Sequence, residues 1–378
     1  MTNPLSPAER LLQQLSAKRK ASGKSVEELA KDLILGPGWI ERFESGKTLP
    51  DLDMFFVLAD RIGINPDTLF HGLRTPNDHE PEAKRLIFGI QAGKDLEVHF
   101  RYANFDAVYV LNGATIKEFN EVLLTLRNGL AGKKNSEDIQ KIKTNAVAQM
   151  FLQAVELWPN ANPSDLWWFV VYRAYCDPYN HPASSALLSF DQSWKRTGGW
   201  ALEEIMVCHY GPELAKHGIK IEIARGDRKQ KLVEQFKVDG RLEADKVDVY
   251  LVGPGDRVFG AVHVKASFAE RRTDDVPMSQ ALIRGGYFSP LWTMDCKSRP
   301  SAHPFNQGEL GATHGHRSAK RKDIEDDELF SACFSYNENT LPTPKGEKTK
   351  ARIINCNFSN PNDAFVDKIL AAWKKFSS

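Results

Sequence analysis

The segment from Lys246 to Lys265 constrains the fold of this chain more than any other. Two stretches rich in β-branched and apolar residues flank Gly253-Pro-Gly, which is typical of a tight turn. The segment is therefore predicted to form a β-hairpin. Asp248 stands on the first strand and Lys265 on the second. Because side chains alternate between the faces of a strand, this acid and this lysine can meet on one face.

Such a pair suits the hydrolysis of a phosphodiester. A carboxylate can hold Mg²⁺ against the scissile phosphate, and a nearby ammonium group can neutralise developing negative charge or orient the attacking water. A strand aspartate and a strand lysine can equally form a structural ion pair, so the pair alone is weak evidence. Upstream, the sequence around Gln192 to Ile205 predicts a helix with two further acids, Glu203 and Glu204.

The remaining pattern predicts three parts. Residues 1–75 read as an all-α bundle of short helices, residues 76–138 as a linker and small connecting subdomain, and residues 139–378 as a large domain. The large domain alternates helices with strands, which indicates an α/β fold with a mixed sheet flanked by helices. No function is assigned to residues 86–132.

The N-terminal part contains Ser25-Val-Glu-Glu-Leu-Ala-Lys-Asp-Leu, then Trp39-Ile-Glu-Arg-Phe-Glu-Ser-Gly-Lys. These motifs resemble the Cro/repressor-like helix-turn-helix family. The resemblance implies that Ser25 caps a helix, that Leu29 and Ala30 pack in the core, and that Lys47 ends the recognition helix beside a phosphate.

The start of the expected recognition helix, Leu35-Gly-Pro-Gly-Trp39, lacks the small polar residues that usually contact base edges. We expect the module to contact DNA through Trp39, Arg42 and Lys47. Two alternatives remain, a protein-interaction or dimerisation bundle and a phosphate clamp without sequence preference. The residues of such a clamp would be Lys18, Arg19, Lys20, Arg42 and Lys47.

Composition excludes several classes of protein. Fifty basic and 49 acidic residues give a net charge of +1, so any surface for a polyanion must arise locally. The five cysteines form no CxxC pair, which indicates reduced thiols rather than zinc fingers. No apolar run approaches the roughly 20 residues that span a bilayer, so we expect a cytoplasmic protein without membrane contact.

Four ordered motifs between roughly residues 140 and 300 resemble the CCGG-cutting group of PD-(D/E)XK type II restriction endonucleases. They are Asp165-Leu-Trp, Ser193-Trp-Lys with Ala201-Leu-Glu-Glu, Val247-Asp-Val-Tyr, and Val258-Phe-Gly through Lys265-Ala-Ser-Phe. The resemblance implies a restriction-endonuclease-like α/β core and Mg²⁺-dependent cleavage of double-stranded DNA. It makes Asp248 the metal-binding acid, Lys265 the catalytic lysine and Glu203 a helix carboxylate at the site.

The chain departs from this group where the next carboxylate is expected. His263 occupies the usual acid position, and Pro277-Met-Ser stands where the group carries a substitute carboxylate. The nearest acids are Asp274 and Asp275. Either one of them, with Asp275 as our candidate metal ligand, takes the role through a shifted loop, or Glu203 supplies it, or activity is reduced.

After the lysine, the group carries an arginine- and aspartate-containing element that reads C:G pairs, and this chain has Ala269-Glu-Arg-Arg. A carboxylate accepts from cytosine N4 and an arginine donates to guanine O6 and N7. We therefore expect Glu270, Arg271 and Arg272 to read a site with a CCGG or CC-N-GG core. A solvated charged turn is the alternative.

A palindromic site implies a homodimer in which each subunit cuts one strand. A restriction enzyme also implies a cognate DNA methyltransferase encoded beside it. Two other functions stay open: a DNA-binding transcriptional regulator with an inactive nuclease-like domain, and a nuclease that serves repair or methylation-directed cutting.

Overall fold

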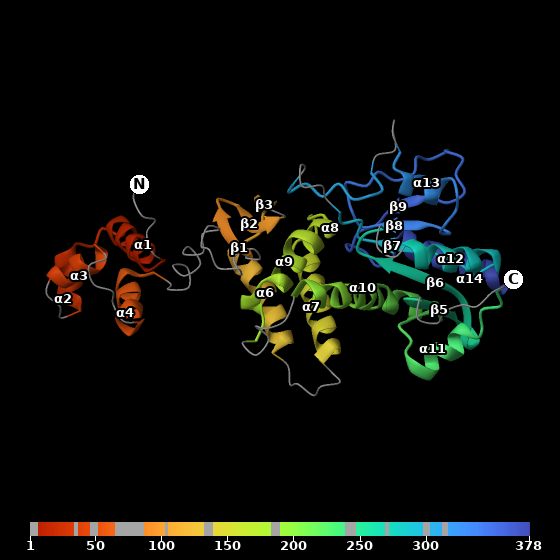
Figure 1. The fold of residues 1–378 in the computed structure, drawn as a ribbon, viewed down its shortest axis with the longest axis horizontal. Coiled ribbons are helices and arrows are strands. Elements are labelled where there is room, and N and C mark those ends of the chain that lie inside the picture. The colour runs from red at the N-terminus through yellow and green to blue at the C-terminus, as the bar shows by residue number, and fades with distance from the viewer. Residues whose placement is uncertain are drawn as a thin grey trace. The chain divides into compact units, whose positions relative to one another are not determined.

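The computed structural model describes residues 7–33, 37–45, 52–64, 87–102, 105–131, 139–182, 190–238, 247–268, 272–297, 303–311 and 317–378. The chain divides into two compact units, Met1–Ala83 and Lys84–Ser378, and each is described by itself (Figure 1). Among the helices in these ranges, none is long and apolar enough to cross a lipid bilayer.

The first unit is helical. Its described helices are α1 (Pro7–Ala21), α2 (Val26–Asp32), α3 (Pro37–Glu44) and α4 (Leu52–Ile62). Ser25 and Glu28 form a capping box, in which the Ser25 hydroxyl accepts from the Glu28 backbone N–H and the Glu28 carboxylate accepts from the Ser25 backbone N–H. Leu29 and Ala30 are each 1% exposed. The predicted cap and core positions are therefore present.

Arg19, one of the residues of the alternative phosphate clamp, forms an ion pair inside the first unit. Arg19 is buried, and its guanidinium Nε lies 2.6 Å from Glu44 Oε1, so it ties α1 to α3. A buried, paired guanidinium is not available to a DNA phosphate. A further helix expected before residue 70 falls outside the described ranges.

The second unit begins with an antiparallel sheet of three strands in the order β1-β2-β3. These strands are β1 (Ile87–Ala92), β2 (Asp95–Tyr102) and β3 (Phe105–Leu111), and two helices follow, α6 (Ile116–Leu130) and α7 (Ile139–Leu157). Buried side chains from all of these elements join one core with the helices of the large domain. The described part of residues 76–138 is thus packed into the second unit and is not a separate connecting subdomain.

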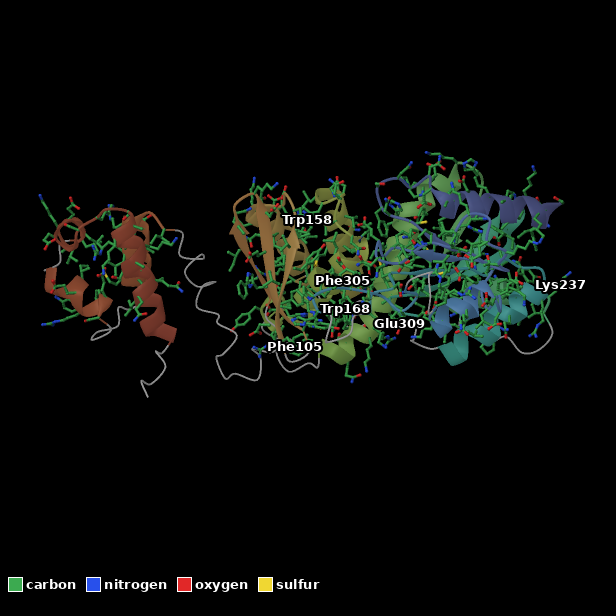
Figure 2. The ribbon with its side chains drawn as sticks, turned by 90° about the horizontal axis from the view of Figure 1, so that it is seen from above. Phe105, Trp158, Trp168, Lys237, Phe305 and Glu309 are labelled. Carbon is green, nitrogen blue, oxygen red and sulfur yellow. The ribbon has the colours of Figure 1, made fainter. Side chains whose placement is uncertain are left out.

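Helical segments link the two sheets of this unit. They are α8 (Pro163–Asp165), a π-helical turn (Leu166–Val171), α9 (Tyr172–Cys176), a 3₁₀ turn (Pro178–Asn180) and the long α10 (Phe190–Ala215). Trp158, at the end of α7, and Trp168, in the π-helical turn, are among the side chains that fill this part of the unit (Figure 2).

The second sheet has six strands in the order β4-β5-β6-β7-β8-β9. They are β4 (Lys220–Glu222), β5 (Val249–Gly253), β6 (Arg257–Lys265), β7 (Leu291–Thr293), β8 (Cys333–Ser335) and β9 (Ile353–Asn355). The first three pair antiparallel and the rest parallel, so the predicted mixed sheet is confirmed. The predicted hairpin is β5 and β6, joined by a 3₁₀ turn (Pro254–Asp256) in which Gly255 has a φ of 73°.

Helices cover both faces of this sheet. On one face, α10 and α14 (Ala364–Ser377) share a core with alternate hairpin residues such as Val249 and Val262. On the other face, α12 (Arg272–Arg284) packs against Tyr250 and Ala261. The unit also contains α11 (Gly226–Val233) and α13 (Ala319–Glu325). The β5–β6 hairpin therefore lies between two helical layers.

Candidate active site

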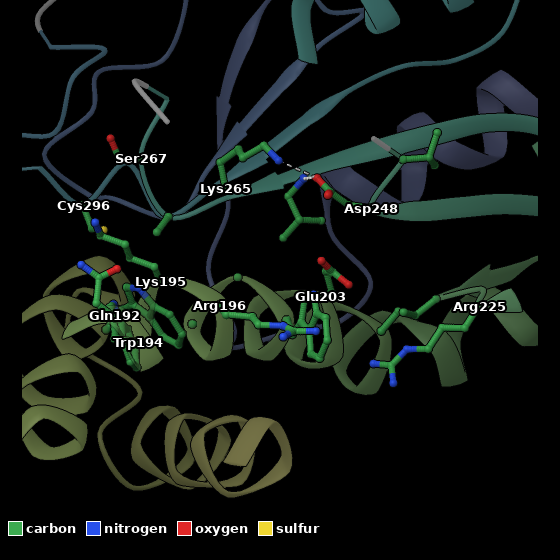
Figure 3. Close-up of a pocket in the computed structure, with 18 of the residues that line it drawn as sticks. Gln192, Trp194, Lys195, Arg196, Glu203, Arg225, Asp248, Lys265, Ser267 and Cys296 are labelled. Atoms are coloured by element: carbon green, nitrogen blue, oxygen red, sulfur yellow. Dashed lines mark hydrogen bonds and ion pairs between the residues drawn. The ribbon is translucent and has the colours of Figure 1, made fainter. Parts of the chain in front are cut away.

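The β5–β6 hairpin brings Asp248 and Lys265 together. Lys265 Nζ donates a hydrogen bond of 2.8 Å to Asp248 Oδ2, and the Val264 backbone N–H donates to the same oxygen at 2.9 Å (Figure 3). A carboxylate oxygen held by a backbone N–H and an ammonium group is fixed in position. The pairing expected from the two strands is therefore present.

A second carboxylate reaches the lysine from α12. Asp275 Oδ2 lies 3.2 Å from Lys265 Nζ, and the Asp275 side chain is 7% exposed. Burial favours the neutral carboxyl group, but His263 and Lys265 outweigh it and hold the pKa of Asp275 below its usual value. Of the acids considered downstream of the lysine, Asp275 is thus an ionised group at the hairpin, and the Asp274 side chain lies outside the described residues.

Lys265 remains an ammonium group between these acids. Burial alone would lower its pKa, but the charges and hydrogen bonds of Asp248 and Asp275 raise it above the ordinary value. The side chain is 10% exposed, so little solvent screens these interactions.

Glu203 approaches the same place from α10 and points toward Asp248 and Lys265 (Figure 3). Burial, and then the negative charge of Asp248, raise the pKa of Glu203 to about 8, although Lys265 opposes the shift. At neutral pH this carboxyl group is mostly protonated. A bound cation would favour its ionised form, because a positive charge lowers the pKa of a neighbouring acid.

The residues present fit a divalent cation. Ligand atoms of Asp248, His263 and Asp275 all lie within 4.8 Å of one another. The carboxylates of Asp248 and Asp275 outnumber the one ammonium group, Lys265, that they both contact. Oxygen donors with excess negative charge are the ligands that Mg²⁺ prefers.

A cavity of about 800 Å³ opens beside this cluster, and Glu203, Asp248 and Lys265 line it. Its other charged lining residues are basic: Lys195, Arg196, Arg225, Lys229 and Lys297. These come from separate segments, so the sequence, with its net charge of +1, did not reveal the concentration of positive charge. A basic cavity around a carboxylate cluster suits a polyanion whose phosphate must approach a metal ion.

Trp200 forms part of the cavity wall, and two of these arginines contact its rings. The guanidinium carbons of Arg196 and Arg225 are 4.5 Å and 5.0 Å from the centre of its rings. Such cation–π contacts orient guanidinium groups without neutralising them.

For several of the predicted DNA-contact residues, the structure does not describe the side chain. Glu270, Arg271 and Lys47 lie outside the described residues, and Arg272 is described only as the first residue of α12. On α3, Trp39 is 47% exposed and Arg42 is exposed, so both side chains are accessible to a partner.

Comparisons with known proteins agree with this architecture. The helix-turn-helix family matches residues 15–69. The type II restriction enzyme AgeI of Thalassovita gelatinovora is 38% identical over 243 residues, which cover 61% of this chain and 85% of that enzyme.

Two solved structures are also similar. The structure of restriction endonuclease AgeI in a specific DNA complex matches with a TM-score of 0.63 and 31% identity, over 76% of this chain and 99% of that one. A pre-specific DNA complex of restriction endonuclease BsaWI matches with a TM-score of 0.34 and 16% identity, over 69% of this chain and 94% of that one.

Proposed function

This chain belongs to the family of type II restriction endonucleases that includes AgeI, and we propose that it cuts both strands of DNA at a palindromic site with Mg²⁺ as its cofactor. The family makes it a site-specific deoxyribonuclease that acts on double-stranded DNA with a divalent metal ion. The choice of Mg²⁺, the site and the residue roles below are our proposals.

The observation that carries the residue assignment is the position of Lys265 Nζ, which lies 2.8 Å from Asp248 and 3.2 Å from Asp275 at a basic cavity. Asp248 and Asp275 would hold Mg²⁺, with Glu203 as a further carboxylate, and the ion would supply charge neutralisation at the scissile phosphate. Lys265 stabilises negative charge on the phosphate oxygens or orients the attacking water. Water adds to phosphorus and loses a proton, the bond to the leaving deoxyribose oxygen breaks, and that oxygen takes up a proton.

For base recognition we propose Glu270, Arg271 and Arg272. The carboxylate would accept from cytosine N4 and the arginines would donate to guanine, which gives a CCGG or CC-N-GG core. The helix-turn-helix domain would contact DNA through Trp39, Arg42 and Lys47. A palindromic site implies a homodimer, and protection of the host genome implies a cognate methyltransferase.

The proposal is tested by digestion of unmethylated phage DNA with Mg²⁺, in parallel with Lys265→Ala. We expect discrete fragments whose ends share one palindrome, and no cutting by the variant, which should still bind the DNA. Unchanged cleavage by Lys265→Ala would remove the lysine from the mechanism. DNA that is bound but uncut by the wild type would favour a regulator with an inactive nuclease domain, which the N-terminal helix-turn-helix domain makes the second candidate.

A further inference from the structure

His263 carries a buried nitrogen that lies at the carboxylate cluster and makes no hydrogen bond to a described residue. The residue is 1% exposed, and its Nδ1 has no hydrogen-bond partner among the described residues. Its Nε2 lies 3.0 Å from the Ser289 hydroxyl. Buried polar atoms are normally satisfied, so an unpaired ring nitrogen at this place requires an explanation.

A chain of hydroxyl groups can hold the tautomer of His263 in which Nε2 carries the proton. Ser279 donates a long hydrogen bond of 3.4 Å to the Ser289 carbonyl oxygen, and the Ser289 hydroxyl donates to the Ser279 hydroxyl at 2.9 Å. With the Ser289 proton used in this way, its oxygen can accept from a proton on His263 Nε2. In that tautomer Nδ1 presents a lone pair.

This lone pair faces a carboxylate. Nδ1 lies 3.6 Å from Asp275 Oδ1, which is beyond hydrogen-bond distance. A positive charge between these two atoms, either a proton on the ring or a metal ion, makes the contact favourable. Lys265 contacts the other oxygen of the same carboxylate, Oδ2, and therefore does not take this position.

We propose that His263 Nδ1 is a direct ligand of the divalent cation that Asp248 and Asp275 hold, so that the site binds Mn²⁺ more tightly than Mg²⁺. This rests on the metal site of the proposed function and adds a nitrogen donor to it. Imidazole favours transition metals over Mg²⁺, which prefers oxygen ligands. A histidine that ligates a metal usually donates its other N–H to a fixed acceptor, the role that Ser289 has here.

The first measurement is pulsed electron paramagnetic resonance of the full-length protein loaded with Mn²⁺ alone. We expect a nitrogen hyperfine coupling from the imidazole, lost in His263→Gln and retained in His217→Asn, which changes an exposed histidine of the same unit. The second is calorimetric titration with Mn²⁺ and with Mg²⁺. His263→Gln should weaken Mn²⁺ binding by about tenfold or more and weaken Mg²⁺ binding by a smaller factor.

Ser289→Ala tests the same idea with the imidazole in place. Loss of the acceptor for Nε2–H should reduce the preference for Mn²⁺ over Mg²⁺. The absence of nitrogen coupling in the wild type, or equal losses for both ions in His263→Gln, would overturn the proposal. If Mg²⁺-dependent cleavage persists in that case, only the histidine ligand is refuted. If neither ion binds and no cleavage occurs, the metal site of the proposed function fails as well.

Discussion

Asp275 is the residue that bears most directly on the three alternatives for the second carboxylate, which are an aspartate after the lysine, Glu203, or reduced activity. It is ionised, buried and 3.2 Å from Lys265 Nζ. We expect Asp275→Asn to lower the rate of DNA cleavage by roughly a hundredfold or more, because a metal-bound carboxylate contributes several kcal/mol to the transition state. DNA affinity measured by gel shift should change little.

Glu204→Gln is the matched control for this prediction, since Glu204 neighbours Glu203 on α10 but does not line the cavity. Its cleavage rate should equal that of the wild type. Normal cleavage by Asp275→Asn, together with a large loss in Glu203→Gln, would instead assign the second carboxylate to α10.

His209, which lies on α10, makes the free energy of unfolding depend on pH. Desolvation lowers its pKa to about 4, and its ring contacts Tyr210 and Phe358. A histidine whose pKa is depressed in the folded state contributes stability above its unfolded pKa of roughly 6.5, and this contribution is lost as the pH falls toward the folded value. The full loss would be about 3 kcal/mol.

We therefore expect His209→Leu to lose less stability than the wild type between pH 7 and pH 4.5. Urea unfolding of both proteins at each pH measures this difference. Asp165, whose pKa is raised to about 7, has an effect of opposite sign, but it is common to both proteins and cancels. A difference in unfolding free energy that does not vary with pH would contradict the assignment.

At the level of elements, the sequence predicts the hairpin well and α12 poorly. Alternating strands and a Gly-Pro-Gly turn are local signals, and they bring Asp248, directly before β5, within reach of Lys265 at the end of β6. Proline usually interrupts a helix, so sequence reasoning favours a helix that begins only after Pro277. In the structure α12 starts at Arg272 and continues through Pro277. This earlier start carries Asp275 to the lysine, which explains why the sequence left the second carboxylate undecided.

The strand β6 needs a glycine where it pairs with the segment before β7. A Cβ on Gly260 would lie 2.2 Å from the Phe288 carbonyl oxygen. That backbone cannot move away easily, because the Phe288 N–H donates to the Phe259 carbonyl and its own carbonyl accepts from Ala261, both at 3.0 Å. We expect Gly260→Ala to lower the free energy of unfolding by about 1–3 kcal/mol.

Gly211→Ala provides the comparison for Gly260→Ala. At Gly211, in α10, an added Cβ meets only Val207 Cγ1 at 4.0 Å, and alanine favours a helix over glycine by up to about 1 kcal/mol. Thermal unfolding of Gly211→Ala should show a small rise in Tm or no change. Equal stability of the two variants would mean that the β6–Phe288 contact is not close-packed.

At the scale of the whole molecule, sequence reasoning missed the features that are built from segments far apart in the chain. The basic cavity gathers residues of α10, the start of α11 and the segment after β7, and no short window of sequence contains them. The sequence likewise did not predict a role for strands β1–β3, because they pack against the helical core of the large unit, which other segments form. Family motifs were recognisable, since Asp248 and Lys265 belong to contiguous strands.

The proposed homodimer predicts how many DNA strands are cut when only one of its two subunits is active. If each subunit cuts one strand, a dimer of one wild-type and one Lys265→Ala subunit contains one competent site. We expect co-expressed mixed dimers to convert supercoiled plasmid into nicked circles that persist, because the second strand faces an inactive subunit. Wild-type dimers should produce linear DNA, and Lys265→Ala dimers should leave the plasmid supercoiled. Linear product from purified mixed dimers, without accumulation of nicked circles, would show that one subunit cuts both strands in turn.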